Sequence, residues 1–371
     1  MSERFRGYLG LARQFVKPNG HRLAVIEGNQ DCNRDCSYCE VPYHYNPDTE
    51  LTVGQTQNAI DWLYSRGYRV LSYLGGEPFA PFKTKEGISF TRHTLEVVEH
   101  AKRKGMLVNV TTNGDYLSSG RPEQMEELEA VGLDSLTLTL HSYTRAGLRH
   151  LIEVGQAAAE HRIIPTIQTI MTRDTSYKIP TIAVRAAKNG VLFRTGIVQT
   201  QGDGFSRKQN ARVIPGVELQ NYVFDFLRRL KRYGFVINNM NYLRHAPEHY
   251  PNSWICDPDQ DPFVKIGAGG KVNVCSGVET GMQIGDFMTF DDDEWRDRKR
   301  RGVAGCKGCM FHCYYEAEHP DVFGDIPLAI VSLAIRSGRH ALVKRWGQKA
   351  SERVIRAMPG FYWGFESILP T

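Results

Sequence analysis

The stretch Leu23-Ala-Val-Ile-Glu-Gly28, followed shortly by Cys32-Asn-Arg-Asp-Cys36-Ser-Tyr-Cys39, decides how the rest of the sequence is interpreted. Its first part is a short apolar run bounded by glycine, which predicts a buried β-strand. Its second part places three cysteines at C-x3-C-x2-C spacing within one loop. Three thiolates so close in sequence can hold three corners of a 4Fe–4S cluster and leave the fourth iron open to a small molecule. A zinc site completed by a remote histidine, or buried thiols without a ligand, are the alternatives that the spacing leaves open.

Apolar runs alternate with amphipathic stretches from this loop as far as residue 199. We expect strands at 23–28, 70–74, 107–112, 135–140, 163–170 and 192–198, and helices at 52–66, 93–104, 122–131, 145–161 and just before 189. About six β/α units in series predict an α/β fold whose parallel sheet closes, fully or partly, into a barrel. Active sites of such barrels lie at the carboxyl ends of the strands, and the candidate residues fall at those positions.

Two further motifs follow the second and third expected strands. They read Gly75-Gly76-Glu77-Pro78 and Thr112-Asn113-Gly114, and aromatic Tyr38 stands just before the third cysteine of the loop. In this combination and order, the chain resembles the radical S-adenosylmethionine (SAM) enzymes, and more narrowly those with a C-terminal SPASM or twitch extension. The resemblance implies a partial (β/α)6 TIM-like barrel in which Cys32, Cys36 and Cys39 hold a 4Fe–4S cluster whose open iron chelates SAM.

The resemblance also implies which residues surround SAM. Gly75 and Gly76 would let the backbone approach the methionyl ammonium, Glu77 would supply negative charge, and Pro78 would fix the turn. Tyr38 would cover the adenine face. Asn113 completes this group of expected SAM-binding residues.

The fourth strand departs from the pattern, since many SPASM enzymes have Ser-Leu-Asp-Gly where this chain has Thr139-Leu140-His141-Ser142. Either Thr139 or Ser142 is therefore the expected ribose contact. His141 is a candidate acid or base on the substrate side, with a structural histidine as the alternative. Gln168 and Arg173 are candidates for contact with the SAM carboxylate or the substrate, and an exposed loop arginine is the ordinary interpretation of Arg173.

Five more cysteines lie in the C-terminal third of the chain. The stretch Gly270-Lys-Val-Asn-Val-Cys275 matches the Gly-x4-Cys element of SPASM and twitch extensions, and Cys306-Lys-Gly-Cys309 supplies a pair. The resemblance implies one auxiliary 4Fe–4S cluster, because five cysteines are too few for two fully cysteine-ligated clusters. A twitch-like arrangement uses Cys256, Cys275, Cys306 and Cys309, whereas a truncated SPASM arrangement uses Cys313 and displaces another. A four-cysteine zinc site is the alternative.

The sequence divides into an N-terminal extension (1–21), a core barrel (22–214), a SPASM- or twitch-like cluster domain (215–325) and a helical tail (326–371). In the cluster domain we expect a helix at 218–231 and a hairpin of 263–266 with 272–274. Residues 254–313 are short on helix signals and rich in Gly, Asp and Cys, as expected where a metal cluster substitutes for an apolar core. The tail holds seven lysines and arginines against two glutamates, which accounts for the whole net charge of +5. A nucleic-acid surface is therefore not expected, because such surfaces are usually basic across the binding domain.

The tail combines apolar Ile326 to Ile335 with the cationic stretch and with aromatic Phe361-Tyr362-Trp363 and Phe365. This composition is typical of an interfacial helix on an anionic membrane, or of a helix packed on the barrel with its basic face in solvent. Neither a signal peptide nor an apolar run of 18 residues is found. We therefore expect a cytoplasmic protein with possible peripheral membrane contact.

The resemblance implies the reaction: reductive cleavage of SAM to methionine and a 5′-deoxyadenosyl radical, with an electron from a flavodoxin- or ferredoxin-type donor, then hydrogen abstraction from a substrate. The auxiliary cluster would assist redox steps in an oxidoreductase or transferase. Many SPASM enzymes modify ribosomal peptides with a leader-binding domain, and only 31 residues precede Cys32. We therefore expect a small organic or lipid-like biosynthetic substrate, with peptide maturation as the alternative. The rival of another class is a zinc-binding interaction module, which would be colourless and would not react with SAM.

Overall fold

The computed structural model describes residues 20, 22–36, 38–39, 50–198, 213–251, 253–275, 277–287, 289 and 291–358. All but one residue of the expected N-terminal extension, and the aromatic residues expected at 361–365, lie outside these described residues.

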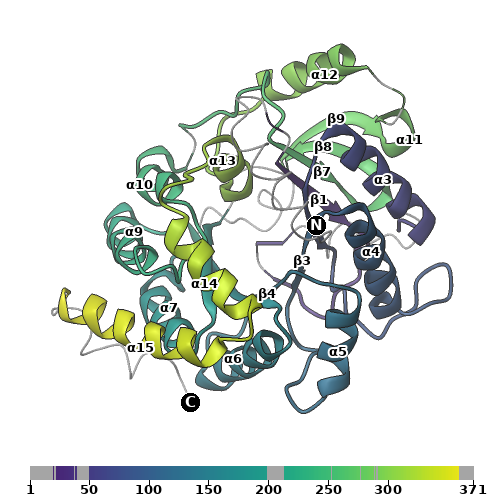
Figure 1. Cartoon of the computed structure of the whole chain (residues 1–371). Coiled ribbons are helices and arrows are strands. Elements are labelled where there is room, and N and C mark those ends of the chain that lie inside the picture. Colours follow the sequence, from purple (N-terminus) through teal and green to yellow (C-terminus); the bar gives the residue numbers. More distant parts are fainter. Residues whose placement is uncertain are drawn as a thin grey trace.

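Six parallel strands form the inner wall of the molecule, and helices surround them (Figure 1). The strands are β1 (Leu23–Glu27), β2 (Val70–Leu74), β3 (Leu107–Thr112), β4 (Ser135–Thr139), β5 (Ile164–Met171) and β6 (Leu192–Ile197). They pair in chain order, with Leu23 opposite Val70 at the start and Thr166 opposite Leu192 at the end. The covering helices are α3 (Val53–Arg66), α4 (Phe90–Lys104), α5 (Pro122–Ala130), α6 (Arg145–Glu160) and α7 (Ile179–Lys188), the last preceded by the short η2 (Ser176–Lys178). The predicted partial α/β barrel is confirmed.

Local sequence signals set the ends of these helices. Thr52 and Gln55 form a capping box at the start of α3, and Gly67 ends that helix with φ 104°. Ser89 caps α4 through its side chain, which starts this helix three residues before the predicted position, and Gly105 ends it with φ 87°. Both glycines adopt the left-handed conformation that residues with a Cβ rarely tolerate.

The C-terminal region extends the same sheet. Strand β7 (Phe263–Ile266) pairs with β1 in parallel, and β8 (Lys271–Cys275) and β9 (Val278–Gln283) follow antiparallel, so that one sheet has nine strands. The predicted hairpin is confirmed, with Ile266 opposite Val272 across the short η4 (Ala268–Gly270), whereas β9 was not predicted. Helix α9 (Val217–Lys231) packs on α7, and Val236 pairs with Phe193, so residues 217–237 extend the barrel wall.

Residues 254–313 show few helix signals in the sequence, yet helices lie within this stretch and on both sides of it. The structure has α10 (Met240–His249), α11 (Ile284–Phe287), α12 (Asp292–Ala304) and α13 (His312–Glu318). Helix α12 has the strongest signal, since Asp291 caps it and its first turn is acidic, but it is too polar to show an apolar stripe. It attaches to the fold through Trp295 and Lys299, which both donate to Asp261 Oδ1 at 2.8 and 2.9 Å.

The tail forms two helices on the outside of the barrel, α14 (Ile326–Arg336) and α15 (His340–Arg356), drawn in yellow-green to yellow in Figure 1. Helix α15 packs on α7 and α9, and α14 packs on α6 and β5. Val331, Ile335 and Val343 are buried in these contacts. Of the two interpretations of the tail, packing on the barrel is therefore observed. Among the described residues, no helix is both long enough and apolar enough to cross a membrane.

Candidate active site

The loop of three cysteines begins directly after β1, at the carboxyl end of the strand. Gly28 N–H donates to Leu74 O at 2.9 Å and continues the pairing of β1 with β2 into this loop. Cys32, Cys36 and Cys39 are half-buried and form no disulfide. Cys39 N–H donates to Cys36 O at 3.1 Å, which forms a turn between these two cysteines. Three cysteines of one loop, none of them in a disulfide, are the donor set that a 4Fe–4S cluster with one open iron requires.

The backbone of the Gly75–Pro78 turn is bonded to the residues just before the first cysteine. Gly76 N–H donates to Asn29 O at 2.8 Å, and Glu77 N–H donates to Asp31 O at 2.6 Å. A Cβ on Gly76 would lie only 1.8 Å from the carbonyl oxygen of Asp31. The close approach that requires glycine at position 76 is therefore the approach of the cysteine loop.

The Glu77 carboxylate is held by donors of the protein, and its expected role toward the methionyl ammonium stays a prediction. Its side chain is 0% exposed. Oε1 accepts from Thr112 Oγ1 at 2.5 Å and from Phe79 N–H at 3.1 Å, and Oε2 accepts from Asn113 N–H at 2.8 Å. Burial raises the pKa of Glu77, and these hydrogen bonds oppose that rise. Glu77 thus joins the motif after β2 to the motif after β3.

Asn113 belongs to a network that holds the cysteine loop from the other side. Its Nδ2 donates to Asn33 Oδ1 at 2.7 Å. Asp115 accepts from Asn33 Nδ2 and from Arg34 Nε, both at 2.7 Å. Burial acts to raise the pKa of Asp115, but the bonds from Arg34 and Asn33 outweigh it and lower this pKa. Sequence reasoning missed Asn33, Arg34 and Asp115, because a polar loop residue gives no signal of its partner.

His141 lies against the cysteine loop rather than toward a substrate. Its Nδ1 is 2.8 Å from the Tyr38 hydroxyl and 3.1 Å from Cys36 Sγ, and the two rings are stacked with centroids 6.2 Å apart. Burial, together with the charge of Arg34, lowers the pKa of His141 to about 4. These contacts place His141 against the loop, and its role as an acid or base stays a prediction.

The other expected SAM-binding residues lie in different surroundings. Thr139 is buried at the end of β4, and Ser142 Oγ is 3.2 Å from Thr144 Oγ1 at the start of α6. Pro78 is buried, and its carbonyl accepts from Thr94 Oγ1 at 2.8 Å. Gln168 lines the central cavity of the barrel, whereas Arg173 is exposed beyond β5, as its ordinary interpretation holds.

A cavity of about 470 Å³ fills the barrel between the cysteine loop and α13. Its lining includes Tyr38 and Cys39 of the cysteine loop as well as Arg194, His312 and Cys313. Asn109 sits in its wall, where it donates to Ser72 Oγ at 3.1 Å and accepts from Thr137 Oγ1 at 2.9 Å. Two ion pairs border the cavity: Lys265 Nζ with Glu27 Oε1 at 2.8 Å, and Arg194 Nη2 with Glu316 Oε2 at 3.2 Å. The cavity thus offers a substrate both apolar surface and fixed charge.

Four of the five C-terminal cysteines gather around a second, small apolar cavity. Cys256, Cys275, Cys306 and Cys309 line it together with Trp254, Val278, Phe311 and Tyr314. Gly277 N–H donates to Cys275 Sγ and Gly308 N–H donates to Cys306 Sγ, both at 3.4 Å. Burial, followed by the charge of neighbouring cysteines, raises the pKa of Cys275 to about 11 and of Cys309 to about 12.

Cys256 and Cys275 are buried, and Cys306 and Cys309 are half-buried. A group of such thiols, whose ionised forms repel one another, is suited to a metal centre that neutralises them. Cys313 is absent from this group. It lines the large cavity instead, where Arg194 Nη2 donates to its Sγ at 3.3 Å. Phe311 lines both cavities, so the four-cysteine group borders the barrel cavity through this side chain. The geometry therefore matches the twitch-like set of four rather than the truncated SPASM set.

Comparison with known proteins gives a family match and several relatives. Residues 26–166 match the model of the radical SAM superfamily. A stretch of 174 residues is 27% identical to PqqA peptide cyclase of Streptomyces rochei and covers 46% of this chain and 42% of that protein. The chain thus spans less than half of the length of this curated relative.

Two solved structures share the fold at low identity. The structure of anSMEcpe with bound AdoMet and Cp18Cys peptide has a TM-score of 0.54 at 11% identity, covering 87% of this chain and 99% of that chain. The structure of Streptococcus suis SuiB bound to precursor peptide SuiA has a TM-score of 0.51 at 13% identity, covering 87% of this chain and 70% of that chain. At such identities the likeness shows the fold alone.

Proposed function

We propose that this chain, whose residues 26–166 match the radical SAM superfamily, binds a 4Fe–4S cluster and SAM. We propose further that it is an enzyme that abstracts hydrogen from a substrate held in the barrel cavity. The observation that carries the proposal is the cysteine loop at the carboxyl end of β1, bonded on one side to Gly76 and Glu77 and on the other to Asn113. These hydrogen bonds hold the cysteine loop in one geometry before a metal binds, as a preorganised site requires.

Cys32, Cys36 and Cys39 would hold the SAM-binding cluster, and three thiolate donors from one loop fit it. When bound, the cluster supplies the electron that cleaves SAM into methionine and a 5′-deoxyadenosyl radical. Tyr38, with its hydroxyl fixed by His141, would cover SAM at the edge of the cavity. The cavity wall would position the substrate hydrogen near the radical carbon and exclude water, which is the contribution a protein makes to such chemistry.

Cys256, Cys275, Cys306 and Cys309 would hold one auxiliary 4Fe–4S cluster. The support is their common cavity, their burial and the N–H groups that donate to two of their sulfurs. Phe311 is the one described residue that lines both cavities, so the two cavities adjoin at this side chain. The auxiliary centre would therefore lie next to the substrate. That position suits an acceptor or relay for the electron left after hydrogen abstraction, and it favours an oxidoreductase over a transferase.

The cavity favours a small polar organic substrate over a lipid-like one. Lys265 with Glu27, and Arg194 with Glu316, bring fixed charge to its border. An alkyl chain placed against these charged groups would displace the water around them. It would offer no hydrogen bonds in return, at a cost of several kcal/mol. A volume of about 470 Å³ lies within the range of small-molecule sites.

Peptide maturation is the second candidate, because the matched relative is named PqqA peptide cyclase and both compared structures contain peptides. The cavity could then hold one peptide side chain while the backbone remains outside. Mass spectrometry after incubation with candidate small molecules and with peptides separates the two candidates. A SAM-dependent mass change in peptides alone would reject the small-molecule proposal.

The central experiment is an assay of SAM cleavage by anaerobically reconstituted protein. We expect about eight irons per chain, absorbance near 400 nm, and 5′-deoxyadenosine formed from SAM in the presence of dithionite. The Cys39→Ser variant should lose this product while keeping the auxiliary cluster. A colourless protein that binds zinc at both cysteine groups and leaves SAM intact would instead support the interaction module.

The tail supports a further proposal, peripheral contact with an anionic membrane. Ile326, Ile330 and Leu333 on α14 are 50%, 49% and 70% exposed, and Leu342 on α15 is 56% exposed. Arg345 and Lys349 are exposed on α15 near these apolar residues in the sequence. Exposed apolar side chains with cations on the same helices are the composition of interfacial binding.

A further inference from the structure

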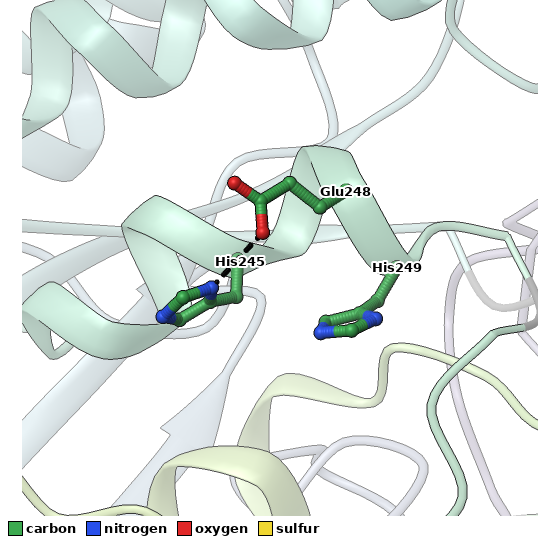
Figure 2. A group of neighbouring side chains, drawn as sticks. All are labelled: His245, Glu248 and His249. Carbon is green, nitrogen blue, oxygen red and sulfur yellow. Dashed lines mark hydrogen bonds and ion pairs between the residues drawn. The ribbon is translucent and has the colours of Figure 1, made fainter.

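Helix α10 carries three potential metal ligands that the proposed radical chemistry does not use. His245, Glu248 and His249 each offer one ligand atom, and these atoms all lie within 4.8 Å of one another. None of the three lines the barrel cavity or the four-cysteine cavity. Figure 2 shows both imidazole rings on one side of the last turns of the helix, with the Glu248 carboxylate turned toward His245.

The sequence explains why these side chains meet. His245 and His249 are four residues apart, and Glu248 is three residues after His245, so that all three lie on neighbouring turns of one helix face. The opposite face is fixed in the fold, because Tyr242, Leu243 and Ala246 are fully buried. The donors therefore stand on a rigid element, and a metal ion would find them already gathered.

Each of the two rings has a polar contact through its Nδ1. His245 Nδ1 is 3.1 Å from Glu248 Oε2, and His249 Nδ1 is 3.1 Å from Ser253 Oγ. Histidines that bind metals usually have their second nitrogen oriented by a carboxylate or another polar group in this way. For His249 the contact with Ser253 leaves Nε2 for a ligand. For His245 a metal ion would take the place of the proton shared by Nδ1 and Glu248 Oε2, so that both groups become ligands.

We propose that His245, Glu248 and His249 form a binding site for a divalent transition-metal ion of the zinc class, separate from both cysteine groups. Two imidazoles and one carboxylate are a donor set typical of zinc sites that keep an open position. Calcium and magnesium prefer oxygen donors alone, so this set selects against them. Helix α10 packs against α13, which carries His312 and Cys313 into the barrel cavity, so bound metal would stiffen a helix next to that wall.

The test is zinc binding to the full-length protein with its clusters loaded, purified without a polyhistidine tag and kept anaerobic. Competition with a chromophoric zinc chelator gives the affinity. The double variant His245→Ala/His249→Ala retains all eight cysteines and should bind zinc at least tenfold more weakly. His245 and His249 are partly exposed, so the fold should tolerate alanine at both positions. An unchanged circular dichroism spectrum and SAM cleavage rate would show that the variant is folded.

The matched control is His161→Ala. His161 Nδ1 lies 2.9 Å from Glu129 Oε2, so it is also a surface histidine paired with a glutamate, but it has no second imidazole in such a group. This variant should bind zinc like the wild type. Equal affinity in the wild type and the double variant would overturn the proposal and leave the three residues as an ordinary surface ion pair with a neighbouring histidine. Because zinc affinity is measured without SAM, failure here would leave the radical SAM proposal intact.

A second readout uses cobalt in place of zinc. Cobalt held by two imidazoles and a carboxylate in a near-tetrahedral site should add visible bands that the double variant lacks. Thermal unfolding should shift upward with zinc in the wild type and in His161→Ala but not in the double variant, since a ligand that binds only the folded state stabilises it. A shift of equal size in all three proteins would contradict the assignment.

Discussion

At the scale of single residues, Gly76 and Glu77 connect the cysteine loop to the barrel through one peptide unit. The backbone of both residues is bonded to Asn29 and Asp31, and the Glu77 side chain is bonded to Thr112 and Asn113. The two residues therefore act on the loop through its neighbours, and their substitution should alter cluster retention before it alters any contact with substrate.

Gly76→Ala tests the first of these roles. An alanine Cβ would lie 1.8 Å from Asp31 O, so the loop must move. We expect the variant to lose about 2 kcal/mol or more of stability and part of its cluster iron. Gly54→Ala is the control, because nothing lies within 4 Å of its Cβ position in α3 and alanine there should stabilise by about 0.5–1 kcal/mol. Iron content and the melting temperature measure both. Retention of full iron by Gly76→Ala would contradict the role of this contact.

Glu77→Gln tests the second role. The amide places an NH2 group where the carboxylate accepts from either Asn113 N–H or Thr112 Oγ1, so one buried donor loses its acceptor, at about 1–3 kcal/mol. We expect a lower melting temperature and less 5′-deoxyadenosine formed per iron. Glu99→Gln on the exposed face of α4 should change neither quantity. If SAM affinity fell while stability stayed constant, Glu77 would instead act directly on SAM.

His93 makes stability depend on pH. It is buried on α4 with Nδ1 2.8 Å from the Tyr73 hydroxyl, and burial lowers its pKa below the ordinary 6.5. The stabilising neutral form is therefore fully present above about pH 6.5 and is lost as the pH falls through the lowered pKa. Below about pH 6.5, the slope of the unfolding free energy against pH should be smaller in His93→Gln than in the wild type, by up to about 1.4 kcal/mol per pH unit. Urea unfolding between pH 5 and 8 measures this, and an unchanged slope would be the contrary result.

Sequence reasoning found the site residues that carry distinctive chemistry and missed those that act through polar contacts. The eight cysteines, the Gly75–Pro78 turn and Asn113 all stand out by residue type and spacing. Asp115 and Arg34 do not, because their importance depends on a contact 81 residues apart in sequence. The orientation of Glu77 was also beyond prediction, since a conspicuous carboxylate in a motif can face the ligand or the protein equally well.

At the scale of elements, α14 and α15 show why a basic, apolar tail has two interpretations. Both helices bury one stripe on the barrel, yet Leu333 is 70% exposed and Leu342 is 56% exposed. Packing and membrane contact are therefore compatible, because they use different sides of the same helices.

The membrane proposal predicts that Leu333→Glu/Leu342→Glu reduces sedimentation with anionic vesicles several-fold, since it removes apolar contact and adds negative charge. The melting temperature should stay constant, because both side chains are exposed. Val217→Glu, at a residue 57% exposed at the start of α9, controls for the loss of an exposed apolar side chain elsewhere. Equal sedimentation of all three proteins, or none by the wild type, would reject membrane contact.

Elements with strong periodicity were predictable, and elements that depend on tertiary partners were not. The six barrel strands and their helices follow from apolar runs and caps, with ends within about three residues of the prediction. Strand β9 and helix α12 lack an apolar pattern, because β9 lies at the sheet edge with alternate residues exposed and α12 buries only Trp295, Lys299 and Val303. Their stability comes from contacts that a single sequence does not reveal.

At the scale of the whole molecule, one continuous sheet positions both cysteine groups. Strand β1 leads into the first cysteine loop, and β7 and β8, which extend from the edge of β1, lead to Cys275. A second buried cluster that includes Cys256, Cys275, Val278 and Tyr314 supports this side. The expectation that metal replaces an apolar core there is therefore too strong, because an apolar core is present around the cysteines.

The different positions of Cys309 and Cys313 lead to a prediction about the complete molecule. Cys309 belongs to the four-cysteine cavity, whereas Cys313 lines the barrel cavity beside Arg194. Cys309→Ser should lose about four irons per chain and much of the stability of the β7–β9 side, because the remaining thiols stay buried without the metal centre. Cys313→Ser should keep about eight irons, since its sulfur is not among the four.

Anaerobic iron and sulfide analysis of the two variants, with cluster spectroscopy, distinguishes these outcomes. Cys313→Ser should also keep the rate at which SAM is cleaved without substrate, because Cys313 is not one of the three cysteines of the first loop. If Cys313→Ser instead lost four irons, the truncated SPASM arrangement would replace the twitch-like one. If both variants kept about eight irons, the four-cysteine cavity would not hold the auxiliary cluster, and the proposal that it relays an electron past Phe311 would be withdrawn.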